Sequence, residues 1–219
     1  MPNKRHPANK SSDFSSDREV DIRIIGGEFR GRRLNYHGDP LVRPMKHRTR
    51  EAIFNLIGIG CGGRHAIDLF AGTGALGLEA LSRGSTSATF IEKHVPTARI
   101  VEENIRILSV EGRAEVLATS AFLWAKRDLQ SAAEKAENPW LVFCSPPYSF
   151  YNDRQDEMLD LIARIRTSAP PDSILVVEAE VPFDFGLIQN AADANDSDAW
   201  DIRTYQPAIV GIWESNQKN

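Results

Sequence analysis

A glycine-rich loop is the first segment of this chain whose residue types could perform chemistry. A predicted buried strand reaches Asp68, and the segment that follows contains Phe70, Ala71, Gly72, Thr73 and Gly74. With Gly77, the glycines have the GxGxxG spacing of a nucleotide-binding loop, because residues without a Cβ let the backbone approach a ligand closely. The Asp68 carboxylate would repel a dinucleotide pyrophosphate and attract a cationic amino group. The loop therefore favours a nucleoside ligand that carries such a cation.

A second acidic residue, Glu92, ends the next predicted strand. A carboxylate there can accept hydrogen bonds from both ribose hydroxyls, which suits NAD and S-adenosylmethionine equally; the alternative is a helix cap at the surface. The run DLFAGTG resembles motif I of class I methyltransferases. Together with Asp68, this resemblance favours S-adenosylmethionine as the cofactor. It also adds Lys93, Ser120 and Ala121 to the expected cofactor-binding residues, with Ser120 near the adenine.

The tetrapeptide Ser145-Pro146-Pro147-Tyr148 follows another apolar run and resembles motif IV of amino-methyltransferases. An exocyclic base amine attacks poorly, because its lone pair is delocalised into the ring. Accepting hydrogen bonds from its protons frees that lone pair, and the resemblance assigns this role to the Ser145 side chain and the Pro146 carbonyl. The prolines hold the carbonyl rigid, and Tyr148 is expected to stack on the extruded base. The alternative is a diproline turn plugged by an aromatic ring.

Alternating elements position these motifs. The expected strands are residues 66–70, 86–91, 114–118, 140–144, 173–178, 200–205 and 208–213, and the expected helices are 75–82, 96–108, 121–137 and 157–168. This α/β alternation predicts a mostly parallel, doubly wound sheet. Ligands of such sheets bind beyond the carboxyl ends of the strands, where the motifs fall. Ahead of the sheet we expect a hairpin over residues 22–34, broken at Gly26-Gly27, and a helix over 49–57.

Charge is distributed unevenly along the chain. The net charge is −4, with +6 over residues 1–64 and −10 over residues 65–219. A basic N-terminal segment is a plausible phosphate-contacting surface; the alternative is a solvated charged face. The expected RNA contacts are Arg23, Arg30, Arg32, Arg33, Arg43, Arg48 and Arg50.

Composition narrows the class of protein further. No apolar run reaches the roughly 18 residues needed to span a bilayer, and residues 1–21 lack the apolar region of a secretory signal. Two cysteines cannot form a disulfide framework or a four-cysteine zinc site, and we expect no metal. We therefore expect a cytoplasmic protein with a disordered tail over residues 1–20, a basic extension over 21–63 and a catalytic domain over 64–219.

Seven sequence blocks together resemble one bacterial family, the ribosomal RNA small-subunit methyltransferase D family. They are residues 23–27 (RIIGG), 30–32 (RGR), 43–44 (RP), 48–55 (RTREAIFN), 68–84 (DLFAGTGALGLEALSRG), 90–93 (FIEK) and 146–148 (PPY). The resemblance implies a class I S-adenosylmethionine-dependent methyltransferase fold, a Rossmann-like doubly wound seven-stranded sheet, with a small N-terminal hairpin and helix extension. It implies methylation of a guanine N2 amine in small-subunit ribosomal RNA, at guanine 966, by a monomer acting on the RNA or the assembled small subunit.

Two departures from the family pattern fall in the motifs. Ser145 stands where the family usually has aspartate, and Ser120 likewise replaces an aspartate. Serine is a neutral, weaker acceptor, which predicts slower transfer or a different target atom. Three alternatives stay open: a DNA or RNA methyltransferase acting on cytosine N4 or adenine N6, an NAD-dependent dehydrogenase, and a non-catalytic ribosome-assembly factor. Asp68 and the PPY run argue against the dehydrogenase, and the intact glycine loop argues against the assembly factor.

Overall fold

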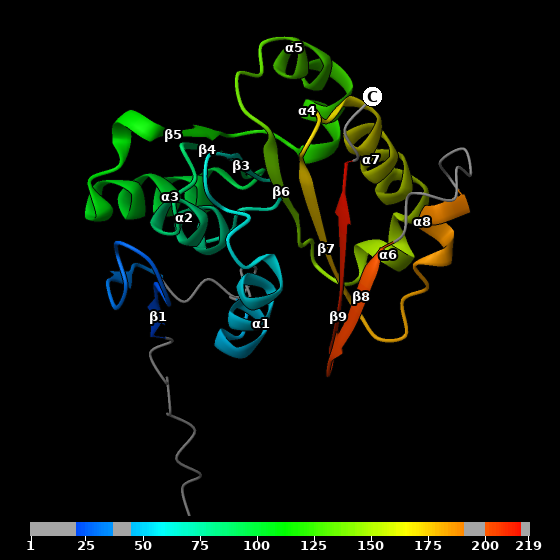
Figure 1. The fold of residues 1–219 in the computed structure, drawn as a ribbon, viewed down its shortest axis with the longest axis horizontal. Helices are drawn as coiled ribbons and strands as arrows, with labels where there is room; N and C mark the ends of the chain where they lie inside the picture. The colour runs from blue at the N-terminus through cyan, green and yellow to red at the C-terminus, as the bar shows by residue number, and fades with distance from the viewer. Residues whose placement is uncertain (1–20, 37–44, 191–199, 216–219) are drawn as a thin grey trace, which may run out of the picture.

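A seven-stranded sheet organises the molecule (Figure 1). The computed structural model describes residues 21–36, 45–190 and 200–215. The strands are β3 (His65–Asp68), β4 (Ser87–Ile91), β5 (Ala114–Leu117), β6 (Trp140–Cys144), β7 (Ile174–Glu180), β8 (Asp201–Tyr205) and β9 (Ala208–Glu214). Their order in the sheet is β5-β4-β3-β6-β7-β9-β8, with β3 to β7 parallel and β9 antiparallel to both neighbours. The predicted doubly wound sheet is confirmed, and its strand order reverses between β3 and β6.

Helices cover both faces of the sheet. The first face is packed by α1 (His47–Ile57), α2 (Ala75–Ser82) and α3 (Val95–Leu108), and the second by α4 (Ala121–Arg127), α5 (Leu129–Glu134), α6 (Phe150–Asp153), α7 (Gln155–Ser168) and α8 (Gly186–Asn190). A short 3₁₀ turn, η1, spans Glu111–Arg113. Each face has its own buried apolar cluster, so the sheet is the shared middle layer of two hydrophobic cores.

Helix α2 is the element that fixes the glycine loop. All of its eight residues are buried, and the helix starts from Gly74 in a left-handed conformation (φ 79°). Gly77 lies so close to β4 that a Cβ there would stand 2.4 Å from the Phe90 Cε1 atom. A glycine is therefore required where the first turn of α2 packs against Phe90 of β4.

The N-terminal extension is docked on α2 through a buried glutamate. Strands β1 (Ile22–Arg23) and β2 (Arg33–Leu34) pair antiparallel. In the loop between them, the backbone N–H groups of Ile25 and Gly26 donate to the two Glu79 carboxylate oxygens at 2.7 and 2.8 Å. Arg83 pairs with the same carboxylate at 2.8 Å. The buried charge is thus compensated by two backbone donors and a guanidinium.

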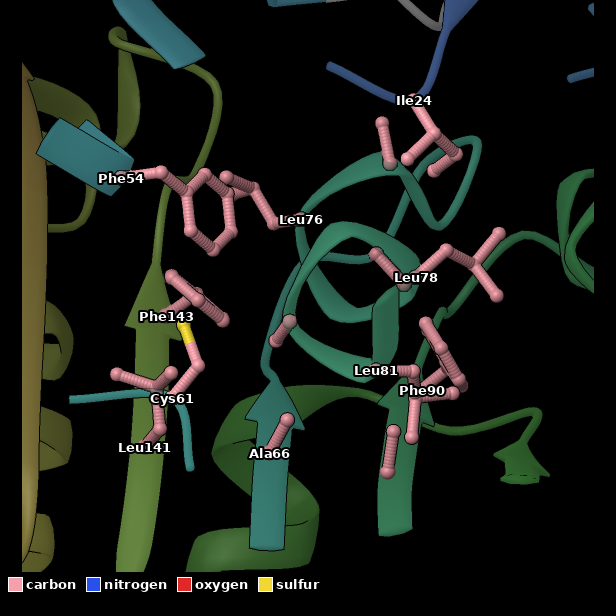
Figure 2. Packing of buried hydrophobic residues seen from close by; sticks show 14 of the residues in the cluster. Ile24, Phe54, Cys61, Ala66, Leu76, Leu78, Leu81, Phe90, Leu141 and Phe143 are labelled. Atoms are coloured by element: carbon pink, nitrogen blue, oxygen red, sulfur yellow. The ribbon is translucent and has the colours of Figure 1, made fainter. Parts of the chain in front are cut away.

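Apolar contacts complete this docking (Figure 2). Ile24 lies against one side of α2, and Phe54 of α1 lies on the other side with its ring 5.6 Å from that of Phe143. Both belong to the same buried cluster as the sheet residues beneath them. The extension therefore shares the hydrophobic core of the first face.

The structure differs from the sequence predictions in four elements. The hairpin is confirmed, but each strand is two residues long and the Gly-Gly step lies within the connecting loop. The long helix expected over 121–137 is two short helices that meet at Asp128. Helices α6 and α8 were not predicted from the pattern. The tail expected over residues 1–20 lies outside the described residues, and no helix among those described is long and apolar enough to cross a membrane.

Candidate active site

The carboxyl ends of β3, β4, β5 and β6 bring the sequence-predicted cofactor and catalytic residues to one edge of the sheet. Its members are Asp68, Phe70, Ala71, Gly72, Thr73, Gly74, Glu92, Lys93, Ser120, Ala121, Ser145, Pro146, Pro147 and Tyr148. Parallel strands end at the same edge, so segments up to 80 residues apart become neighbours there. The switch point of the sheet, between β3 and β6, lies in the middle of this edge.

The glycine loop after β3 is a tight turn anchored to its neighbours. Its two glycines, Gly72 and Gly74, both have positive φ angles (53° and 79°) that favour residues without a Cβ. The Ala71 N–H donates to the Ile91 carbonyl at 3.0 Å, and the Gly74 N–H donates to the Ala71 carbonyl at 2.7 Å. The backbone is therefore held in place for close approach by a ligand.

Asp68 is a buried carboxyl group at this edge. Its side chain is 1% exposed; Oδ2 accepts the Gly77 N–H at 3.2 Å, whereas Oδ1 has no hydrogen-bond partner among the described residues. Burial raises the pKa of this carboxyl to about 7, against the lowering effect of the Gly77 and Phe70 backbone N–H groups, and the charge of Glu92 raises it further. An orphaned buried carboxylate oxygen fits a ligand that brings a positive charge, such as the ammonium group of a methionine moiety.

Glu92 closes the glycine loop from the next strand. One carboxylate oxygen accepts the Gly72 N–H at 2.9 Å and the other accepts the His94 N–H at 2.8 Å. Each oxygen keeps a second lone pair that can accept a hydroxyl hydrogen. The half-buried carboxylate can therefore act on a ribose without leaving the loop that it holds.

Three phenylalanines, which the sequence reasoning did not group, form an aromatic wall at this edge. Phe70 contributes from the glycine loop, Phe122 from α4 and Phe150 from α6, with ring centroids 5.9 to 6.1 Å apart. The Arg154 guanidinium lies over Phe122 at 4.0 Å from the ring centroid. Phe122 directly follows the predicted cofactor residues Ser120 and Ala121, so the wall adjoins the expected adenine position.

The SPPY segment leaves β6 beside a carboxylate that the sequence did not point to. Pro146 is buried, and among the described residues no donor reaches its carbonyl oxygen. The Ser145 hydroxyl donates to Oε2 of Glu178, and the Tyr148 hydroxyl donates to Oε1 of the same residue at 2.7 Å. The Pro147 carbonyl is engaged, since it accepts the Phe150 N–H at 2.9 Å. The segment thus offers the acceptor pair expected for an amine, the Ser145 hydroxyl and the Pro146 carbonyl.

The basic extension exposes most, but not all, of the predicted RNA-contacting arginines. Exposed side chains are those of Arg23, Arg30, Arg32, Arg33 and Arg48, whereas Arg43 lies outside the described residues. Asp21 pairs with Arg23 and Arg33 at 2.7 and 2.8 Å and so offsets part of their charge. Arg32 also donates to the Ile107 carbonyl.

Arg50 departs from the predicted set. It is 2% exposed, and its guanidinium donates to the backbone carbonyl of Arg23. Burial lowers the pKa of this guanidinium. Arg50 therefore lies beneath the surface and ties α1 to β1 instead of facing a phosphate.

The strand order and the glycine loop together define a class I methyltransferase fold. The structure superimposes on a protein described as "Putative methyltransferase yhhF" from Escherichia coli with a TM-score of 0.69, at 24% identity over 90% of this chain and 99% of that chain. An RNA methyltransferase from Salinibacter ruber, in complex with S-adenosyl-L-homocysteine, matches with a TM-score of 0.54, at 15% identity over 81% of this chain and 96% of that chain.

Sequence comparison identifies the family. The family described as Conserved hypothetical protein 95 matches residues 22–194. Ribosomal RNA small subunit methyltransferase D of Escherichia coli (strain K12) is 35% identical over 160 residues, 73% of this chain and 75% of that protein. Its Haemophilus influenzae counterpart is 29% identical over 161 residues, 73% of this chain and 79% of that protein. The chain therefore belongs to the ribosomal RNA small subunit methyltransferase D family.

Proposed function

We propose that this protein transfers the methyl group of S-adenosylmethionine to the N2 amine of a guanine in small-subunit ribosomal RNA, at guanine 966. One observation carries the proposal: a carboxylate oxygen of Asp68 that has no hydrogen-bond partner among the described residues and the acceptors of the SPPY segment lie at the ends of the adjacent strands β3 and β6. The Asp68 oxygen fits the cation of the cofactor, and the acceptors of the SPPY segment fit the amine of the target. Membership of the family supports the RNA substrate.

Each residue at the cofactor end has a separate task. Asp68 holds the ammonium group, Glu92 accepts the ribose hydroxyls and Ser120 lies near the adenine. When bound, S-adenosylmethionine supplies an electrophilic methyl group. The fixed backbone of Gly72 and Gly74 orients the ligand, which lowers the entropy that must be lost on reaching the reactive geometry.

At the target end, the protein acts on the guanine amine by hydrogen bonding. Ser145 and the Pro146 carbonyl accept the two amine hydrogens and direct the nitrogen lone pair toward the methyl group, while Tyr148 supports the flipped base. The attacking amine is neutral, and its surplus proton becomes acidic after transfer and leaves to water. The exposed arginines of the extension contact phosphates of the RNA or of the assembled small subunit, and the protein acts as a monomer.

A labelling experiment tests this proposal. The full chain is incubated with radiolabelled S-adenosylmethionine and, in parallel, small ribosomal subunits that lack the modification, naked ribosomal RNA and duplex DNA. We expect label in the ribosomal RNA, and at least about tenfold less label when Asp68→Asn replaces the wild type at limiting cofactor. Label in DNA would favour a DNA amino-methyltransferase, and cofactor binding without transfer to any substrate would favour an assembly factor. Binding of NAD in calorimetry would contradict the cofactor assignment.

A further inference from the structure

A buried carboxylate stands directly behind the proposed amine acceptor. β6 and β7 are parallel neighbours in the sheet (Figure 1). Cys144 pairs with Val177, so the residues that follow, Ser145 and Glu178, lie side by side and are hydrogen-bonded to each other. Glu178 is 5% exposed, and its two oxygens accept hydrogens from the hydroxyls of Ser145 and Tyr148. The Tyr151 hydroxyl donates to the Glu178 backbone carbonyl at 3.0 Å. Side chain and backbone of this glutamate are thus both fixed.

The direction of the Ser145 hydrogen bond decides what its oxygen can do next. A hydroxyl has one hydrogen and two lone pairs. Because the hydrogen is donated to Glu178, the remaining lone pairs of Ser145 Oγ can only accept. A hydrogen bond to an ionised carboxylate also shifts electron density onto the donor oxygen, which strengthens it as an acceptor.

We infer that Glu178 is a positioning residue for methyl transfer: it orients and polarises the Ser145 hydroxyl so that this neutral side chain accepts a hydrogen from the target amine. The inference rests on the proposed function, because it gives Glu178 a role only if an amine is the group methylated. Glu178 acts through Ser145 and does not itself contact the substrate. Tyr148 is held by the same carboxylate, so the base-supporting ring and the amine acceptor share one anchor.

Protonation of Glu178 would reverse this arrangement. A neutral carboxyl group carries its own hydrogen and can donate to Ser145, which removes the constraint on the serine. Burial raises the pKa of Glu178, against the lowering effect of the Ser145 and Tyr148 hydrogen bonds. The neighbouring titratable groups are the Cys144 thiol, the phenols of Tyr148 and Tyr151, and the Asp68 carboxyl. Burial raises the pKa of the Cys144 thiol to about 12, and the charge of Asp68 also raises it. Activity should therefore fall as the pH falls through the pKa of Glu178.

The test compares two glutamines introduced on the same strand. Glu178→Gln removes the charge behind Ser145, whereas Glu180→Gln, the matched control, changes an exposed glutamate two residues further along β7. We expect Glu178→Gln to lower kcat about 10- to 100-fold, the range for loss of a hydrogen bond to a charged group. KM for RNA and the Kd for S-adenosylmethionine should change little, and the acidic limb of the pH–kcat profile should disappear. Glu180→Gln should match the wild type in all of these.

A serine-to-aspartate background separates a positioning role from a structural one. In Ser145→Asp a second carboxylate stands within hydrogen-bond reach of Glu178, and mutual repulsion keeps one of the two protonated, so adding Glu178→Gln removes that repulsion and should leave kcat unchanged or raise it. An equal loss in both backgrounds, or a Glu178→Gln protein with wild-type kcat and pH profile, would overturn the inference. A wild type that methylates no RNA would overturn the proposed function and this inference together. An active wild type that is indifferent to Glu178→Gln would overturn the inference alone.

Discussion

Asp68→Asn should stabilise the free protein while weakening its cofactor binding. The folded-state pKa of Asp68, about 7, lies above the value of 3.8 for an unperturbed aspartate. As the pH rises, the unfolded chain therefore loses the Asp68 proton before the folded chain does. The free protein therefore loses stability as the pH rises from about 4 to 7, and the loss is complete above the folded pKa. Each pKa unit corresponds to about 1.4 kcal/mol, so the buried charge costs about 4 kcal/mol at pH 8.

The substitution does not recover all of this free energy. The asparagine oxygen can keep the Gly77 hydrogen bond, but its NH₂ group then stands where Asp68 Oδ1 has no described partner. An unsatisfied buried amide costs about 1–3 kcal/mol. The net gain in unfolding free energy at pH 8 is therefore about 1–3 kcal/mol, and it should vanish or reverse at pH 5, where the wild-type carboxyl is largely neutral.

Denaturant unfolding of both proteins at pH 5 and pH 8, without cofactor, measures this gain. Calorimetry on the same samples should show S-adenosylmethionine bound at least about tenfold more weakly by Asp68→Asn, because a charge-assisted hydrogen bond contributes about 1.5–3 kcal/mol. An asparagine variant less stable than the wild type at pH 8, or a stability difference independent of pH, would refute the electrostatic account of Asp68.

Two further predictions concern α2 and the extension. Gly77→Ala would push a Cβ into Phe90 and should lower the unfolding free energy by about 1–3 kcal/mol, whereas Gly112→Ala, with open space around it, should change it by less than about 1 kcal/mol in denaturant titrations. Arg48→Ala should weaken RNA binding and reduce the salt slope of the affinity by about 1 without altering stability. Arg50→Ala should instead lower stability by about 1–3 kcal/mol and leave the salt slope unchanged; identical behaviour of the two arginine variants would contradict their different burial.

The parallel core of the fold follows from local sequence pattern. The strand β6 is an apolar run bounded by polar or turn residues, β3 places the buried Ala66 and Ile67 directly before Asp68 and the glycine loop, and α2 begins at a glycine and ends before another. Such segments are buried on both sides, so their composition alone distinguishes them. Helices α6 and α8 have four and five residues, too few to show a helical period.

Two residues show where sequence reasoning stops. Arg50 was counted by charge, yet it is spaced three, four and seven residues before Ile53, Phe54 and Ile57, all buried on the same face of α1. That spacing was a usable signal of its burial. Glu178 offered no such signal, because its contact with Ser145 depends on β7 pairing with β6, which is a property of the strand order.

Identification of the methylated nucleoside tests the central claim most directly. Small ribosomal subunits lacking the modification are treated with the wild-type protein and S-adenosylmethionine, and the RNA is digested to nucleosides for chromatography and mass spectrometry. The account predicts N2-methylguanosine as the new nucleoside, mapped to a single guanine and reduced in the Glu178→Gln protein. A methyl group found instead on cytosine N4 or adenine N6, or no new nucleoside from a protein that binds the cofactor, would contradict it.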